Sequence, residues 1–288
     1  MHELVWKPLT AHPGRGGMLA ERRPCAALQP YICCFWGGTG QTEPPTWVVP
    51  DTCVDLIFRI GEDAGRTDAC FCGLGDQPYR TAGGGCHSLF AIRWYAWTAA
   101  FFSEDALCDT RNRTFAGGQH FPALTAALAP RLAAVRDFSA RTRLAEQVLL
   151  ARLAESPRAM PAAVETAVGA LVQAGGNLRV AELLHTTFCS ARQLERQFTA
   201  WLGCPPKTLA GLIRYQCLWR SLLTDPRWDV QDAVARFGFA DQAHLLRSFK
   251  KYHGMTPAAA LALARAAEPV AFLQADEGEN PEIGRAHV

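Results

Sequence analysis

Two short stretches of this 288-residue chain carry side chains that could form hydrogen bonds with the edges of DNA bases. Arginine can donate two hydrogen bonds to guanine, and glutamine can pair with adenine in a similar way. The positive charge of lysine attracts the phosphates of the DNA backbone. We expect DNA contacts from these stretches and from one nearby lysine, namely Arg192, Gln193, Glu195, Arg196, Lys207, Gln242, Ala243, His244, Leu246, Arg247, Lys250 and Lys251.

Each stretch has the pattern of a helix with one face in a core and the other in solvent. Apolar residues recur every three or four positions, and Ser190 and Asp241 precede the two helices as favourable N-caps. A short apolar helix and a tight turn come before each, so the sequence predicts two helix-turn-helix units. The expected helices are 162–173, 179–184, 191–202, 206–223, 230–237, 242–253 and 257–266, with Asn177 as a further N-cap and Gly203, Gly238 and Gly254 near C-termini.

The helix expected between the two units has a length that suits DNA. The eighteen residues 206–223 would span about 27 Å at roughly 1.5 Å per residue. Successive major-groove faces on one side of a duplex are about 34 Å apart, and the flanking turns lengthen the connection. Two recognition helices of one chain could therefore enter adjacent major grooves.

Charge is distributed unevenly along the chain. The formal net charge is +2, but segment 176–266 has twelve lysines and arginines against six acidic residues, a net charge of +6. Such a basic segment attracts phosphate. Solvated helix faces often show a similar excess, so the charge supports a nucleic-acid partner only together with the helix pattern.

The C-terminal third resembles a known family over two long runs. FGFADQAHLLRSFKKYHGMTP is similar to the C-terminal signature of the AraC/XylS transcription regulators, and SARQLERQFTAWLGCPPKTLAGLIRYQCLWRSLL is similar to their first recognition helix and linker helix. The resemblance implies a transcription regulator that binds double-stranded DNA and reads bases with both recognition helices. One departure is Phe188, which stands in the first turn where the family usually has a small, glycine-like residue.

The N-terminal part has short β-branched and aromatic runs separated by glycine-rich turns, with strands expected at 31–36, 47–49, 54–60 and 89–98. We therefore expect an α+β chain, with a β-rich, cupin-like sandwich or barrel, linker helices and a C-terminal all-α domain. LQPYICCFW followed by VVPDTCVDLIFRIG is similar to the sensor half of a subgroup of the same regulators. This second resemblance implies a small-molecule effector and a homodimer.

An effector pocket in the β-rich part would need apolar walls with a few polar groups. The alternative is that most of its aromatic residues form the core, which is their commoner role. The expected effector-binding residues are Trp36, Trp47, Asp55, Phe58, Trp94 and Trp97.

Changes in composition suggest how the chain is divided. We expect a β-rich effector-sensing domain at 1–118, linker and dimerisation helices at 119–158, the DNA-binding domain at 159–266 and a disordered acidic tail at 267–288. Apolar residues of 121–153 recur at helical spacing and favour two helices that pair protomers.

Several other classes of protein find little support. No signal peptide or membrane span is visible, so we expect a cytoplasmic protein, and the usual motifs of enzymes and cofactor sites are missing. The eleven cysteines lack the paired spacing of zinc sites, so we expect reduced thiols, no metal and no cofactor. A metal- or thiol-responsive regulator stays open as the alternative, with Cys33, Cys34, Cys70, Cys72 and Cys86 as its sensing residues.

Overall fold

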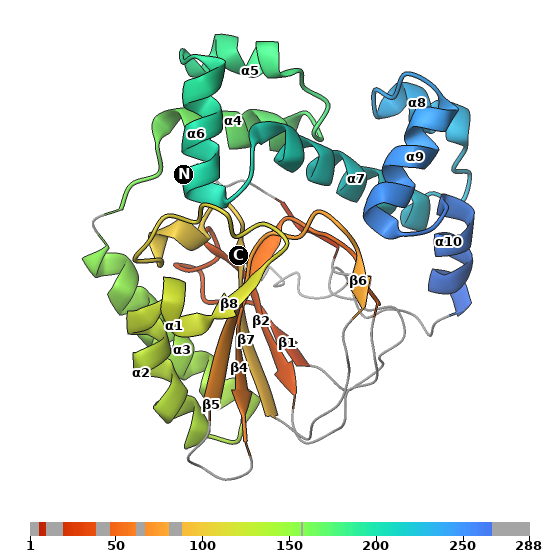
Figure 1. The fold of residues 1–288 in the computed structure, drawn as a ribbon. Helices are drawn as coiled ribbons and strands as arrows, with labels where there is room; N and C mark the ends of the chain where they lie inside the picture. The colour runs from red at the N-terminus through yellow and green to blue at the C-terminus, as the bar shows by residue number, and fades with distance from the viewer. Residues whose placement is uncertain are drawn as a thin grey trace, which may run out of the picture.

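A computed structural model describes residues 6–9, 20–38, 47–61, 67–80, 88–156 and 158–266. A β-sheet carries two helices on one of its faces, and the helices from α4 onward gather beyond one end of that sheet (Figure 1). This is the α+β order expected from the sequence. Cys86, Pro157 and the expected acidic tail lie outside the described residues.

The β-rich part consists of a six-stranded antiparallel sheet and a separate two-stranded one. The large sheet has the order β1-β2-β7-β4-β5-β8, with β1 and β8 at its edges, and β3 pairs with β6. Four strands were expected from the sequence, and their bounds are β2 (Ile32–Gly38), β3 (Trp47–Val48), β4 (Cys53–Ile60) and β7 (Ser88–Tyr95). The others are β1 (Ala20–Arg22), β5 (Thr67–Cys72), β6 (Tyr79–Arg80) and β8 (Thr114–Ala116).

The core of this part lies between the large sheet and two helices. Along β4, Leu56 and Phe58 are fully buried, whereas Asp55 and Arg59 face the other side of the sheet. The helices α2 (Pro122–Ala133) and α3 (Phe138–Glu155) cover the buried face. A 3-10 turn, η1 (Ala99–Phe101), and the short α1 (Gly117–His120) complete this half.

The C-terminal half is entirely helical and follows the expected bounds closely. Its helices are α4 (Ala162–Gln173), α5 (Val180–Thr187), α6 (Ala191–Leu202), α7 (Pro206–Thr224), α8 (Val230–Arg236), α9 (Gln242–His253) and α10 (Pro257–Ala266). Glycines in the left-handed conformation end α6 and α9, as expected, because only glycine adopts it without strain. None of the helices within the described ranges is both long and apolar enough to cross a membrane.

One expected cap is wrong. The N-cap of α5 is Arg179 and not Asn177. Asn177 lies two residues earlier and packs against the turn of the second helix-turn-helix unit, where a Cβ built on Gly238 would lie 2.1 Å from its Oδ1. The Asn177 side chain therefore makes a tertiary contact instead of capping α5, as the local sequence pattern had predicted.

Candidate nucleic-acid interface

The first recognition helix, α6, presents its polar face to solvent. Ser190 caps it, and the serine Oγ accepts a hydrogen bond from the backbone N–H of Gln193 at 3.2 Å. Leu194 and Phe198 are fully buried on the inner face. All four predicted DNA-binding side chains of this helix are exposed, namely Arg192, Gln193, Glu195 and Arg196.

The second recognition helix, α9, is capped in the same way, but two of its predicted contact residues turn inward. Asp241 Oδ1 accepts a hydrogen bond from the backbone N–H of His244 at 2.6 Å. His244 is half-buried, and its Nδ1 accepts a hydrogen bond from the Ala240 N–H at 3.3 Å. Leu246 is also half-buried against the core. The exposed predicted contacts are Gln242, Ala243, Arg247, Lys250 and Lys251.

The turn before each recognition helix contains a residue in the left-handed conformation. In the first unit this residue is Phe188, with φ 51° and a side chain that is 94% exposed. In the second it is Gly238, with φ 65°. The departure seen in the sequence at Phe188 is therefore a real backbone feature, because a bulky residue occupies a conformation that favours glycine.

The helix between the units, α7, packs against α6 and α9. The Tyr215 hydroxyl and His253 Nδ1 are 2.8 Å apart and hydrogen-bonded, and the rings of His253 and Trp219 have centroids 4.5 Å apart. Burial lowers the pKa of His253 to about 4, so this side chain is neutral near pH 7. Lys207 is exposed in the first turn of α7.

The sequence analysis missed two residues that join the β-rich half to the helical half. Trp201, in the last turn of α6, is buried, and its Nε1 donates a hydrogen bond to the Trp97 carbonyl at 2.8 Å. Gln216, in the middle of α7, is 2% exposed and donates to the Pro50 carbonyl at 2.9 Å. Gln216 stands out in the sequence only as a polar residue among apolar neighbours.

The predicted effector residues do not form one cluster. Phe58, Trp94 and Trp97 are buried in the core of the β-rich half. Trp47 instead contacts α9, because its Nε1 donates a hydrogen bond to the His253 carbonyl at 3.1 Å. A cavity of about 410 Å³ lies elsewhere, between α4, α7 and α8.

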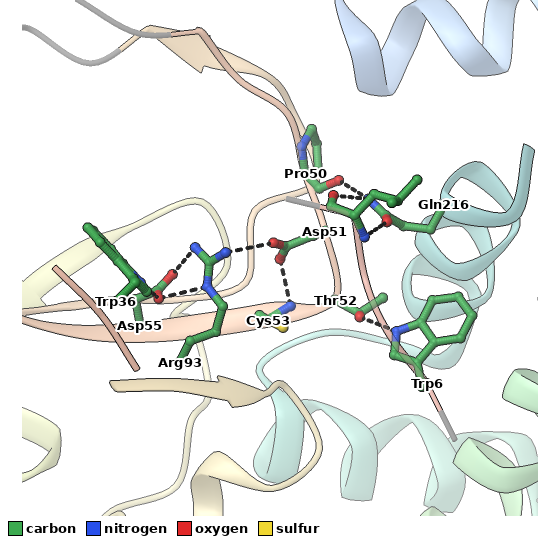
Figure 2. A network of polar contacts seen from close by, with 10 residues as sticks. Trp6, Trp36, Pro50, Asp51, Thr52, Cys53, Asp55, Arg93 and Gln216 are labelled. Carbon is green, nitrogen blue, oxygen red and sulfur yellow. Dashed lines mark hydrogen bonds and ion pairs between the residues drawn. The ribbon is translucent and has the colours of Figure 1, made fainter. Parts of the chain in front are cut away.

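Trp36 and Asp55 do meet on the sheet face opposite α2 and α3 (Figure 2). The Asp55 carboxylate accepts hydrogen bonds from Trp36 Nε1 at 2.8 Å and from Arg93 Nε and Nη2, both at 2.9 Å. Asp51 forms a second ion pair with Arg93 at 3.5 Å. Burial alone would lower the pKa of Arg93, but these carboxylates raise it, so the guanidinium remains charged.

The cysteines show no metal centre in the part of the chain that the structure describes. No group of three or more histidine, cysteine, aspartate or glutamate side chains is placed there to hold a metal ion. The ten cysteines within the described ranges are free thiols.

Comparison with known families then defines the helical half. A family model described as a helix-turn-helix domain matches residues 183–262, which include both recognition helices. Residues 183–262 are therefore a helix-turn-helix DNA-binding domain of the AraC type. Residues 20–115 match a second family, a domain of unknown function named DUF6597. A comparison with curated proteins finds no match.

Three solved structures are similar to this chain over part or most of its length. The DNA-binding domain of AdpA, in complex with a target DNA, is 27% identical and covers 38% of this chain and 96% of its own, with a TM-score of 0.34. An AraC-type regulator from Chromobacterium violaceum is 23% identical over 38% and 95% of the two chains, with a TM-score of 0.33. ToxT from Vibrio cholerae is 9% identical over 90% and 99%, with a TM-score of 0.41.

Proposed function

We propose that this AraC-type regulator reads two adjacent major grooves with α6 and α9, and that a small-molecule effector held in the β-rich half changes its affinity for DNA. The observation that carries the proposal is that the β-rich half contacts α6, α7 and α9 together. Because DNA is its ligand, we place its action in the cytoplasm.

The contact with α6 is made by the C-terminal end of this recognition helix, opposite its N-cap. Besides the Trp201 hydrogen bond, the Leu107 N–H donates to the Ala200 carbonyl at 2.9 Å. The Trp201 ring also meets Phe101 edge-on, with centroids 5.4 Å apart. These contacts hold the C-terminal turn of α6 while leaving its exposed arginines free to approach a groove.

The contact with α7 uses the whole side-chain amide of Gln216. Its Nε2 donates to the carbonyls of Pro50 and Leu9, at 2.9 and 3.2 Å, and its Oε1 accepts the Leu9 N–H at 2.6 Å. A buried amide with both ends bonded is costly to separate from its partners. The linker helix is thereby tied to the segment that leads into β4.

The contact with α9 again uses the C-terminal end of a recognition helix. Trp47 donates to the His253 carbonyl, and its ring lies against Gly254, where a built Cβ would come within 2.4 Å of the indole. Gly254 has φ +82°. A glycine is therefore required here both by the backbone conformation and by the close approach of Trp47.

Together these contacts provide a way to couple an effector to DNA. Two recognition helices bind adjacent grooves only if their separation matches the helical repeat of about 34 Å. In the network of Figure 2, Asp55 lies on β4 and Arg93 lies on the neighbouring strand β7. Asp51 belongs to the segment that leads into β4 and directly follows Pro50, whose carbonyl binds Gln216. An effector that binds one arrangement of this sheet face better than another would shift the separation of the units.

Selection of DNA fragments from a random pool by the full-length protein tests the proposal. We expect two half-sites whose centres are about 10–10.5 base pairs apart. Enrichment of a single half-site, or of no sequence, would contradict reading by both helices.

Half-site spacing also tests whether the contacts of the β-rich half with α7 and α9 set the separation of the two units. The parent protein should bind only its selected spacing. Trp47→Phe and Gln216→Leu, which remove the hydrogen bonds to α9 and α7, should tolerate an inserted or deleted base pair. Arg131→Ala, on the exposed side of α2, is the control and should behave like the parent. If all four proteins tolerate altered spacing equally, the contacts with α7 and α9 do not set the separation of the two units.

We also propose that the regulator is a homodimer. The leucines of α2 that suggested pairing, Leu124, Leu128 and Leu132, are fully buried against the chain's own sheet, so they are not the dimer contact. Leu150, on the outer side of α3, is 37% exposed. Light scattering of the full-length protein at micromolar concentration should give twice the mass of the chain, and the mass of a single chain would reject the dimer.

A further inference from the structure

Two cysteines on one strand face the same side of the large sheet. Cys70 and Cys72 lie on β5 on either side of Phe71, which is fully buried, so both thiols point to the face opposite α2 and α3. The two thiols hydrogen-bond to each other. The pleat of a single strand therefore places the two thiols side by side on one face of the sheet.

An arginine of the neighbouring strand lies beside this pair. Arg59 of β4 is exposed, and its guanidinium hydrogen-bonds the Cys70 sulfur. The hydrogen bond from Cys72 lowers the pKa of Cys70, and the charge of Arg59 lowers it further, against the opposing effect of burial. The same hydrogen bond, followed by burial, raises the pKa of Cys72. Cys70 is thus the more acidic thiol of the pair, and Cys72 is the one that keeps its proton.

Other thiols on the same face of the sheet lack this arrangement. Cys34 and Cys53 are buried, and each hydrogen-bonds Cys33. The hydrogen bond with Cys33 and then burial raise the pKa of Cys34, and burial raises the pKa of Cys53 to about 11. Protonated thiols are poor nucleophiles. The two groups of cysteines therefore differ in the property that controls oxidation.

We propose that Cys70 and Cys72 form a redox-active dithiol that a small hydroperoxide, with hydrogen peroxide as the simplest example, oxidises to a disulfide. The Cys70 thiolate attacks one peroxide oxygen, an S–O bond forms as the O–O bond breaks, and the departing hydroxide takes up a proton to become water. The Cys72 sulfur then attacks the Cys70 sulfur and displaces the hydroxyl, which leaves as water with the Cys72 proton. Two thiols and one peroxide become one disulfide and two waters.

The geometry of the strand makes this disulfide reversible. Residues i and i+2 of an extended strand have Cα atoms about 6.6–6.8 Å apart. Disulfides most often join Cα atoms about 5.5–6 Å apart, with Cβ atoms about 3.5–4.5 Å apart, so β5 would have to shorten locally to form a relaxed bond. Strained disulfides of this kind are reduced more easily than relaxed ones.

Shortening β5 would act on the network of Figure 2. Cys72 pairs in register with Asp55, and Asp55 binds Arg93. Arg93 also pairs with Asp51, which directly follows the carbonyl that binds Gln216 on α7. This consequence rests on the proposed function: if it holds, oxidation changes the affinity for the selected DNA several-fold.

The reduced full-length protein, treated with substoichiometric hydrogen peroxide and then alkylated, provides the test. Trypsin should release 67–80 as one peptide that contains Cys70 and Cys72 and no other cysteine. We expect this peptide to lose two hydrogens and to escape alkylation before Cys108, which is exposed and lies outside the pair, is oxidised. If the peptide remains a fully alkylated dithiol while Cys108 oxidises, the proposal is wrong.

Variants distinguish the site from general thiol oxidation. C70S should abolish the disulfide, C108S should leave it unchanged, and Arg59→Gln should slow its formation several-fold. Arg22→Gln, an exposed arginine on β1, is the matched control and should have no effect on the rate. Equal rates in Arg59→Gln and Arg22→Gln would remove Arg59 from the site. The peptide readout involves no DNA, so a failure of the regulator proposal would leave this result standing.

Discussion

The two helix-turn-helix units form the same turn in different ways. In the second unit the left-handed residue is Gly238, and the side chain of Asn177 fills the place where a Cβ would lie. In the first unit it is Phe188, whose ring is almost wholly in solvent. A non-glycine residue costs about 1–2 kcal/mol in this conformation. The second turn is therefore fixed by packing, whereas the first is strained and open.

The first helices of the two units, α5 and α8, are also capped in different ways. Asp229 caps α8, and its Oδ1 accepts the N–H groups of Gln231 and Asp232 at 2.7 and 3.3 Å. The N-cap of α5 is Arg179, and an arginine side chain has no acceptor for such groups. In α5 the contact is reversed, because Glu182 Oε2 accepts the backbone N–H of Arg179 at 2.6 Å. Both helices are thus capped locally, but only α8 is capped by the side chain of its N-cap residue.

The largest effect is expected from adding one methyl group to the second turn. Gly238→Ala should lower the free energy of unfolding by about 2–4 kcal/mol, because the left-handed backbone is strained and Asn177 must move. Urea denaturation measures it. Gly169→Ala, in the interior of α4 with open space around it, is the control and should be neutral or stabilising by up to about 1 kcal/mol. Equal unfolding midpoints for the two variants would mean that the second turn is not fixed by packing.

Acid should weaken the second unit through His253. The folded-state pKa of about 4 lies below the ordinary value of 6.5, so the unfolded chain binds more protons between these values. Stability is then complete above pH 6.5 and falls, by up to about 3 kcal/mol, as the pH drops towards 4. Urea denaturation from pH 7 to 4.5 should show a smaller acid loss in His253→Gln. His185 of the first unit is exposed, so His185→Gln is the control and should show the same dependence of unfolding free energy on pH as the parent. If His253→Gln also shows the parent's dependence, the burial of His253 is not the cause of the acid loss.

Base reading should be comparable in the two units despite their different turns. Arg196→Ala and Arg247→Ala should each weaken binding to the selected DNA by about 1–3 kcal/mol and relax base preference in one half-site only. Fluorescence anisotropy on selected and random duplexes measures both effects, with Arg131→Ala as the control. An equal loss on selected and random DNA would show that these arginines contact phosphates and not bases.

A smaller and opposite effect is expected at the first turn. Phe188→Gly should raise the free energy of unfolding by about 1 kcal/mol, because glycine removes the left-handed strain and the exposed ring has little packing to lose. The gain is reduced by the extra backbone entropy of glycine in the unfolded chain. Urea denaturation that shows Phe188→Gly to be less stable than the parent would mean that the ring makes a stabilising contact.

The smallest effects should come from the two lysines that end α9. Both lysines are exposed, but the Lys251 ammonium also lies 4.7 Å from the Tyr252 ring centroid. Lys250→Ala should reduce the slope of log affinity against log salt by about one, and Lys251→Ala by less. Titrations at several salt concentrations check this order, and unchanged slopes would place both lysines outside the interface.

Local patterns determined most of the helical half. The bounds of α4, α6, α9 and α10 agree with those expected from the sequence, because apolar periodicity, capping by Ser190 and Asp241 and the glycines that end α6 and α9 all act within a few residues. The exposed faces of α6 and α9 follow from the same periodicity. His244 and Leu246 are the exceptions, because contacts with the turn and the core draw them inward.

The remaining features depend on contacts between distant residues. Strands such as β5 are recognisable only by their pairing, since hydrogen bonds between Thr67–Cys72 and β4 define them and their own residues show no clear alternation. Trp47 was expected in an effector pocket, yet its partner His253 is 206 residues away along the chain. The sequence by itself determined two capped, basic recognition helices, because that information is local. The tertiary structure alone decided that the β-rich half holds both of them and α7, because contact across such separations depends on how the whole chain packs.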